Sequence, residues 1–139
     1  MAFVHRTPIR FAHVDAAGIV FYPRYFEMLN AAFEDWVADV AGVDFATLHL
    51  GQRIGTPMVN MEATFKHPGR LGEMLDIELV LTRLGTSSLT MAARFTVEGA
   101  PRLRVVLTSV CMDLETARAM PWPEEMRARM AALVVTAEG

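Results

Sequence analysis

The chain has 139 residues, 53% of them hydrophobic, with a formal net charge of −3 and a single cysteine. This length suits a core of normal size without disulfides or metals, and we predict a single domain over residues 1–139. The lack of a basic tract argues against nucleic acid as a main partner, and no apolar run approaches the ~20 residues that would cross a membrane.

The first part of the chain predicts a strand, a turn and one long helix. Residues 3–12 are expected to form the strand, and the small residues at positions 16–18 form the turn. From residue 22 or 23 to about residue 40, apolar side chains recur at three- and four-residue spacing, which is typical of an amphipathic helix. Gly42 suits the C-terminal stop of this helix. A loop or a short helix is expected over residues 44–53.

The apolar period then changes to two, which is typical of strands. Four antiparallel strands joined by short turns are expected over residues 58–65, 74–84, 89–97 and 102–114. A short helix at about residues 123–134 follows them, and the tail after residue 135 is expected to be loose. This order predicts an α+β fold in which a curved antiparallel sheet wraps one long helix.

The one cysteine, Cys111, lies within the last of these predicted strands. A single cysteine excludes an internal disulfide and a cysteine-rich metal site, and no metal-ligand spacing such as HExxH is present. A buried, inert thiol is favoured over a nucleophile, because no basic partner for it is apparent. Residues 1–10 lack an apolar segment typical of a secretory signal, so we expect a reduced, cytoplasmic protein.

Residues 15–25 (DAAGIVFYPRY) resemble the signature of the hotdog-fold acyl-CoA thioesterases of the 4-hydroxybenzoyl-CoA thioesterase type. Residues 55–59 (GTPMV) and 65–73 (FKHPGRLGE) are similar to later segments of that family. The resemblance covers roughly residues 5–115. It implies the hotdog fold and hydrolysis of an acyl-CoA thioester to a free acid and coenzyme A. Coenzyme A is then part of the substrate, and neither a cofactor nor a metal is implied.

Asp15 is the main catalytic candidate, because it precedes a glycine turn and the start of the long helix. The free N–H groups of a helix start can bind a developing oxyanion while an acid acts on the same carbonyl. In the resembled family, the aspartate at this place attacks the thioester or activates water. The resemblance gives the oxyanion donor as the backbone N–H of Tyr22; because Pro23 has no N–H, the donor is Tyr22 or a residue past Pro23. Gly18 would supply the turn conformation. The plainer alternative is that Asp15 is an ordinary turn or cap residue.

The candidates for substrate binding are Tyr25, Thr56, Asn60 and Arg83. Tyr25 either lines the acyl pocket or belongs to the core. Thr56 and Asn60 either contact substrate, Asn60 across a subunit interface, or satisfy backbone groups. The phosphates of coenzyme A need cations, although each single cation is more simply a solvated charge. The basic side chains available for this purpose are Arg83, Arg94, Arg102, Arg104, Lys66 and Arg70.

Three further residues are minor candidates. If the first segment stays extended, His13 and Asp15 point the same way, and His13 can tune Asp15 or shuttle a proton. Many relatives carry an acid where this chain has His13. Glu27 and Glu34 lie on nearly one face of the helix and are fallback acids, because a second branch of hotdog thioesterases takes its carboxylate from the long helix. Solvated glutamates are the plainer interpretation of both.

Two other functions stay open. One is a non-catalytic module that binds acyl-CoA or an acyl carrier, and the other is a hotdog hydratase. The hydratase is disfavoured, because residues 24–29 lack the histidine that such enzymes place after the aspartate. Hotdog domains pair edge to edge with the active site between subunits, and the high apolar content also suggests a covered surface. We therefore expect a homo-oligomer, a dimer or more readily a homotetramer. The acyl group is not specified.

Overall fold

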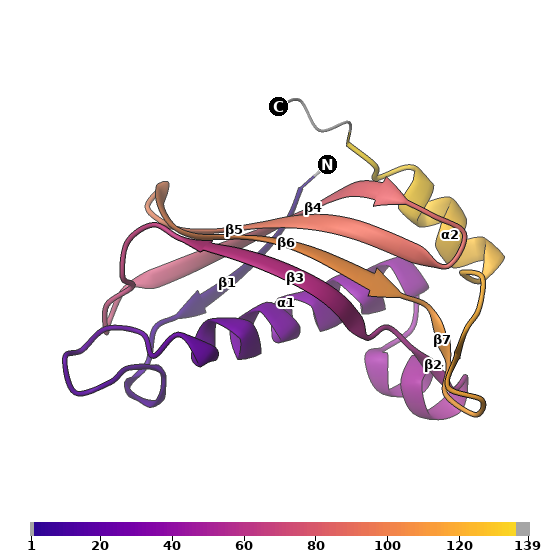
Figure 1. The fold of residues 1–139 in the computed structure, drawn as a ribbon, viewed down its shortest axis with the longest axis horizontal. Coiled ribbons are helices and arrows are strands. Elements are labelled where there is room, and N and C mark those ends of the chain that lie inside the picture. The colour runs from indigo at the N-terminus through magenta and orange to yellow at the C-terminus, as the bar shows by residue number, and fades with distance from the viewer. Residues whose placement is uncertain (1, 136–139) are drawn as a thin grey trace.

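The computed structural model describes residues 2–135 (Figure 1). Its elements follow one another in the order β1 (Phe3–Pro8), the 3-10 turn η1 (Phe11–His13), α1 (Pro23–Ala41), the π-helical turn η2 (Thr47–Gly51), β2 (Ile54–Gly55), β3 (Met58–Phe65), β4 (Met74–Leu84), β5 (Ser88–Val97), β6 (Ala100–Val110), β7 (Met112–Asp113), β8 (Arg118–Ala119) and α2 (Glu124–Ala131).

Five strands form one antiparallel sheet in the order β1-β4-β5-β6-β3, and this sheet curves over α1 (Figure 1). The strands β4, β5 and β6 alternate between buried and less buried residues, as the period of two predicts. On β4 the buried side chains are Leu75, Ile77, Leu79 and Leu81. An antiparallel sheet wrapped around one long helix is the hotdog fold that the sequence predicts.

The long helix α1 fills the concave side of the sheet. It begins at Pro23 and ends at Gly42, whose φ of 75° and N–H bond to the Ala38 carbonyl form a left-handed cap. The predicted apolar stripe is buried, and each large apolar side chain in it contributes about 1.5–3 kcal/mol of transfer free energy. The buried residues of α1 are Tyr25, Met28, Leu29, Ala32, Phe33, Trp36, Val37 and Val40.

Two predicted strands are too long. The first strand ends at Pro8, because the His13 N–H bonds back to the Arg10 carbonyl (2.9 Å) and closes the 3-10 turn Phe11–His13. The last strand stops at Val110. Cys111 lies outside the main sheet, and its N–H bonds to the carbonyl of Ser87, the residue before β5. The next residue, Met112, pairs in a separate small sheet of β2, β7 and β8.

The C-terminal helix is confirmed but shorter than predicted. It covers Glu124–Ala131, and Met126 and Met130 are the buried residues on its inner face. The tail after residue 135, which the sequence predicts to be loose, lies outside the described residues. No helix of the described chain combines the length and the apolar character needed to cross a membrane.

Cys111 is fully buried, as predicted, and burial raises the pKa of its thiol to about 11. The reactive thiolate is therefore scarce in the folded protein at neutral pH. We expect a thiol reagent at pH 8 to modify the native protein about 100-fold more slowly than the urea-unfolded chain. Equal rates in the two states would contradict this assignment. Since the folded pKa lies above the unfolded one, this group destabilises the fold only as the pH rises above about 9.

Strand β3 is an uncovered edge of the sheet. It pairs with β6 on one side, and on its other side no described strand is present. All residues of β3 after Met58 are exposed, including the apolar Val59, Met61 and Phe65. An exposed apolar edge strand is a template for pairing with another chain. This edge lies beside α1, so its occupant would also lie near the long helix (Figure 1).

Candidate active site at the start of the long helix

Asp15 opens a tight turn that leads into the long helix. Its N–H bonds to the Ile19 carbonyl (2.9 Å) and its carbonyl accepts the Gly18 N–H (3.0 Å). Gly18 has a φ of 75°, a conformation that favours glycine, as the sequence predicts. The Asp15 Oδ1 atom accepts the Ala17 N–H at 2.8 Å, so the carboxylate is held in an Asx turn.

The turn engages only one of the two carboxylate oxygens of Asp15. The side chain is exposed and lines an open depression together with Phe11, Val14, Gly18 and Leu71. One oxygen is oriented by Ala17, and the other has no hydrogen-bond partner among residues 2–135. The plain interpretation as a turn residue and the catalytic one are therefore compatible.

The start of α1 leaves one backbone donor free. Pro23 has no N–H, the Arg24 N–H bonds to the Phe21 carbonyl (2.9 Å), and the Tyr25 N–H bonds to the Tyr22 carbonyl (3.2 Å). The Tyr22 N–H, by contrast, has no acceptor within the part of the chain that the structure describes. Tyr22 is the N-cap of the helix, where the partial positive charge of the macrodipole is concentrated. The open donor is thus the one that the sequence singles out.

His13 does not lie as the extended-strand expectation requires. It belongs to the 3-10 turn, and its Nδ1 accepts the Arg10 N–H at 2.8 Å. The expectation of an extended segment from His13 to Asp15 is wrong, because the local bonds to Arg10 outweigh strand pairing there. In this arrangement His13 supports the backbone that leads to Asp15.

A second turn, at residues 69–73, holds the Asp15 segment from the side. The Val20 N–H bonds to the Gly69 carbonyl (2.9 Å), and the Leu71 N–H bonds to the Gly18 carbonyl (3.0 Å). Glu73 accepts the Arg70 N–H (2.7 Å) and an Arg102 N–H (3.1 Å). Burial raises the pKa of Glu73, but these bonds outweigh burial and lower it overall.

Tyr25 joins the core to this turn. Its hydroxyl accepts the buried Gly69 N–H at 2.9 Å, and its ring contacts Phe65 and Phe95. Burial raises the pKa of Tyr25, and the bond from Gly69 partly offsets that effect. Tyr25 also lines a hollow at the helix start that Tyr22 and Lys66 share. Tyr25 therefore belongs to the core and also borders a hollow, while its predicted contact with the acyl group stays a prediction.

We expect Tyr25→Phe to lower the free energy of unfolding by about 1–3 kcal/mol, because the buried Gly69 N–H would lose its partner. Urea unfolding measures this change. Tyr22→Phe is the matched control, since the Tyr22 side chain is 60% exposed and its hydroxyl has no partner among the described residues. That control should shift stability by less than about 0.5 kcal/mol. Equal losses in both variants would contradict the proposed bond.

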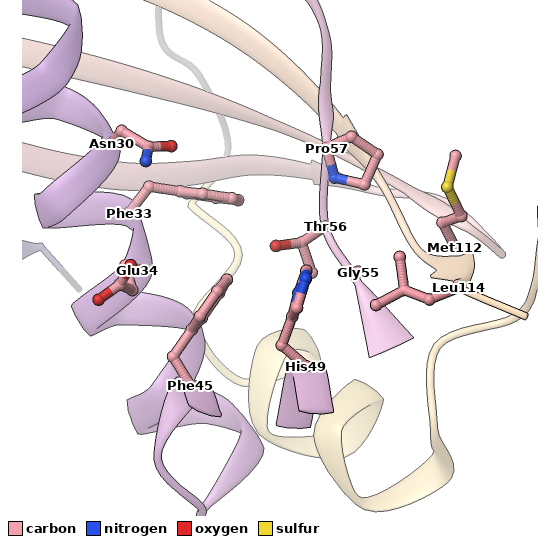
Figure 2. Close-up of a pocket in the computed structure, with 10 residues that line it drawn as sticks. All are labelled: Asn30, Phe33, Glu34, Phe45, His49, Gly55, Thr56, Pro57, Met112 and Leu114. Atoms are coloured by element: carbon pink, nitrogen blue, oxygen red, sulfur yellow. The ribbon is translucent and has the colours of Figure 1, made fainter. Parts of the chain in front are cut away.

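Further along α1 lies a cavity of about 250 Å³, bounded by the middle of the helix, by η2 and by the segment before β3 (Figure 2). Thr56 is buried there, and its carbonyl accepts the Ser109 hydroxyl at 3.0 Å. Glu34 also lines this cavity, whereas Glu27 forms a surface ion pair with Arg24 at 2.9 Å. Of the two fallback acids, only Glu34 lies beside a cavity.

Two of the residues predicted to bind substrate, Asn60 and Arg83, do not lie at the start of α1. Asn60 is exposed on β3, opposite Thr108. Arg83 lies near the end of β4 that is remote from Met74, and an 11-residue strand spans about 35 Å. Arg83 is therefore far from Asp15 within one chain. Lys66, next to Tyr22, and Arg70, bridged to Ile19, are the nearer cations.

Sequence reasoning missed the side chains that give the cavity its character. The ring of His49 stacks on Phe45 with centroids 5.6 Å apart, and Asn30 faces the same space from α1 (Figure 2). The segment at residues 44–53 shows no periodic pattern in the sequence. The structure is therefore needed to place Phe45 and His49 beside Asn30 on α1. Among residues 2–135, no group of histidine, cysteine and acidic side chains is suited to hold a metal ion.

Residues 9–130 match the Thioesterase-like superfamily. The 1,4-dihydroxy-2-naphthoyl-CoA hydrolase of Synechococcus elongatus is 26% identical over 120 residues, which are 86% of this chain and 88% of that protein. The long-chain acyl-CoA thioesterase FadM of Escherichia coli is 27% identical over 128 residues, which are 91% of this chain and 95% of that protein. A solved structure of a thioesterase-superfamily protein from Jannaschia sp. CCS1 superposes with a TM-score of 0.90 at 26% identity, covering 97% of this chain and 94% of that one.

Proposed function

Because this chain belongs to the thioesterase-like superfamily, we propose that it hydrolyses an acyl-CoA thioester to a free acid and coenzyme A. The observation that carries the proposal is the exposed Asp15 carboxylate, which precedes a helix whose N-cap residue, Tyr22, has a backbone N–H without an acceptor among residues 2–135. Both similar enzymes, the hydrolase and FadM, bear the names of CoA thioester hydrolases. A carboxylate and an oxyanion donor are the groups that this reaction needs.

In the proposed reaction, the thioester carbonyl oxygen accepts the Tyr22 N–H. Asp15 then acts at the carbonyl carbon, either directly as a nucleophile or by removing a proton from water. The carbon–sulfur bond breaks, coenzyme A leaves as the thiolate, and water supplies the second oxygen of the acid. One oxyanion donor typically lowers the barrier by about 3 kcal/mol, and the helix dipole adds to it. Lys66 and Arg70, beside this site, would bind the phosphates of coenzyme A.

The proposed enzyme works as a homo-oligomer, at least a dimer. The exposed edge of β3 pairs with the same edge of a second copy, and a two-fold axis makes this pairing antiparallel. The end of β3 at Phe65 contacts Tyr22 (6.4 Å between ring centroids), whereas its start follows Thr56 and the cavity. Antiparallel pairing therefore brings the cavity of one subunit to the helix start of the other.

Distances along α1 favour this composite arrangement. Within one chain, the cavity residues Asn30 and Glu34 lie about two and three turns from the helix start, or roughly 10 and 16 Å. An acyl group whose carbonyl sits at Tyr22 reaches that cavity in its own subunit only if it extends along the helix over about 10 Å. In the pair, the cavity provides a natural place for the acyl group of the thioester that the partner's helix start activates.

The test is hydrolysis of a panel of acyl-CoAs with short, long and aromatic acyl groups, followed by release of the coenzyme A thiol. We expect turnover of at least one member with a kcat/KM of about 10⁴ M⁻¹s⁻¹ or more. Calorimetric binding of the same thioesters is measured in parallel. Binding without turnover across the panel would refute the hydrolase and identify the protein as a binding module.

A further inference from the structure

Arg102 and Glu73 form a largely buried ion pair beside the turn at residues 69–73. The Arg102 Nη2 atom donates to Glu73 Oε2 at 3.1 Å, and the two side chains are 15% and 26% exposed. The other pairs between an arginine and a carboxylate among residues 2–135 are more exposed. A pair that is shielded from solvent is screened less than a surface pair, so it can hold two segments in a fixed relation.

A β-bulge places Arg102 at this position. Phe95 of β5 pairs with Leu103 of β6. The next residue, Thr96, pairs with Pro101, so Arg102 is the extra residue of the bulge. Bulges re-aim single side chains and are frequent next to active sites.

The arrangement around Arg102 is not the one that stability alone would favour. Its Nε atom is buried and has no hydrogen-bond partner in the described part of the chain. A buried donor without a partner is unfavourable, and a buried ion pair adds little net stability compared with apolar side chains of similar size. A geometric function explains the pair better than a stabilising one.

Glu73 uses its two carboxylate oxygens for two different contacts. While Oε2 binds Arg102 on β6, Oε1 accepts the Arg70 N–H at 2.7 Å. The Glu73 N–H also bonds to the Arg70 carbonyl at 3.1 Å. One side chain therefore fixes the shape of the turn and attaches it to the sheet. Glutamine has a single acceptor oxygen, so it could keep only one of these contacts.

The turn is packed tightly against the core at Gly69. A Cβ atom at this position would lie 2.8 Å from Ile9 Cδ1, 2.9 Å from the Tyr25 hydroxyl oxygen and 3.2 Å from Val20 Cγ2. Real Cβ atoms do not come this close to other atoms, so the turn has no room to move toward these side chains. A displacement of the turn must then displace its neighbours.

Two backbone bonds join this turn to the segment between Asp15 and Tyr22. They are the Leu71 N–H bond to the Gly18 carbonyl (3.0 Å) and the Val20 N–H bond to the Gly69 carbonyl (2.9 Å). Both bonds lie between the carboxylate and the open N–H of the candidate site. The position of the turn is therefore transmitted to the two groups that the reaction uses.

From this arrangement we propose that Glu73 and Arg102 are positioning residues, which hold the Asp15 carboxylate and the Tyr22 N–H in the relative geometry that hydrolysis needs. The inference rests on the proposed function, since it concerns the two groups of that reaction. Glu73 and Arg102 act through the turn and take no part in breaking the thioester. A displacement of about 1 Å at such groups can cost about 100-fold in rate.

The first test measures kcat and KM of Glu73→Gln and Arg102→Met on a thioester that the wild type hydrolyses. We expect kcat to fall about 10- to 100-fold while KM stays within about threefold, because the variants lose transition-state geometry rather than binding. Arg102→Lys keeps a cation that can reach Glu73 Oε2, so its kcat should stay within about fivefold of the wild type. A kcat that neither Glu73→Gln nor Arg102→Met lowers would refute the proposal.

Arg129→Met is the matched control for a loss of stability. The Arg129 Nη1 atom donates to the Val40 carbonyl at 3.1 Å, at the opposite end of α1 from Asp15. This variant also loses a hydrogen bond of a partly buried guanidinium, but its kcat should stay within about twofold. Equal losses of kcat in Arg129→Met and Arg102→Met would show a general effect of destabilisation and would contradict the positioning role.

The double variant tests whether the two residues act as one unit. When either partner is absent, the link between the turn and β6 is already broken. Arg102→Met added to Glu73→Gln should therefore lower kcat by less than about twofold further. Losses that multiply in the double variant would mean that the residues act independently, which would overturn the proposed pair.

Amide hydrogen exchange tests the positioning without turnover. In Glu73→Gln, exchange at the Val20 and Leu71 N–H groups should be at least about tenfold faster than in the wild type. The Gly42 N–H, bonded to the Ala38 carbonyl at 3.0 Å, is the internal reference and should not change. Unchanged exchange at Val20 and Leu71 would refute this inference. A wild type that hydrolyses no thioester would instead refute the proposed function, so the two failures are distinguishable.

Discussion

Asp15→Asn is expected to lower kcat by about 10²–10⁴-fold on any thioester that the wild type hydrolyses. The amide can neither attack the carbonyl as a carboxylate does nor remove a proton from water. Its Oδ1 can still accept the Ala17 N–H, because asparagine forms the same Asx turn as aspartate. The variant should therefore remain folded, with circular dichroism and melting temperature close to those of the wild type.

The chain contains a matched control for this substitution. Asp113 accepts the Glu115 N–H at 2.8 Å, and its carbonyl accepts the Ala117 N–H at 2.8 Å. As at Asp15, the side chain accepts the N–H of the residue two positions later, but this turn lies on the β7–β8 connection. Asp113→Asn should leave kcat within about twofold. If Asp15→Asn were equally active, Asp15 would be only a turn residue, and Glu34 would be the next carboxylate to test.

The role of Asp15 is decided by a single turnover in ¹⁸O-labelled water with enzyme in excess. A nucleophilic carboxylate forms a mixed anhydride, and water that attacks it at the aspartyl carbon leaves ¹⁸O in Asp15. A general base directs the labelled oxygen into the acid product alone. Mass spectrometry of the peptide that contains Asp15 separates these routes when label appears there, and the Asp113 peptide serves as the unlabelled reference.

The sequence predicts the regular part of this fold well, because burial alone specifies it. The alternating strand β4 and the stripe of α1 each bury one face, so their periods appear directly in the sequence. The ends of elements depend on single hydrogen bonds instead. The Arg10–His13 turn and the departure of Cys111 from the sheet have no periodic signal, and both predicted strands were too long there.

In the candidate site too, the sequence predicts the parts that are local in the chain and misses those that distant segments build. Asp15, Gly18 and Tyr22 lie within one short segment, where local turn geometry determines their relation, so the sequence alone is enough to propose all three as candidates. The cavity is made by segments that are distant in the chain. His49 comes from an irregular turn, and its surroundings are the ring of Phe45 and, at the buried Nδ1, no hydrogen-bond partner among residues 2–135. Such a relation requires the three-dimensional structure.

Activity should return when two inactive variants are combined, if the cavity serves the partner's helix start. Asn30→Trp fills the cavity from an exposed position of α1, so it blocks the acyl group without disturbing the core. Alone, it should lower kcat/KM by about 100-fold or more for a bulky acyl group. Asp39→Trp, at another exposed position of α1 and outside the cavity, is the matched control and should retain activity.

Co-expression of Asp15→Asn and Asn30→Trp with different tags gives a mixed pair in which one site combines an intact Asp15 with an intact cavity. Half of randomly assembled dimers are mixed, and each has one such site of two, so about a quarter of wild-type activity should return. A site contained within one chain would give no recovery, because each subunit then carries one defect. Recovery therefore assigns Asp15 of one subunit and the cavity of the other to one catalytic unit shared by two subunits.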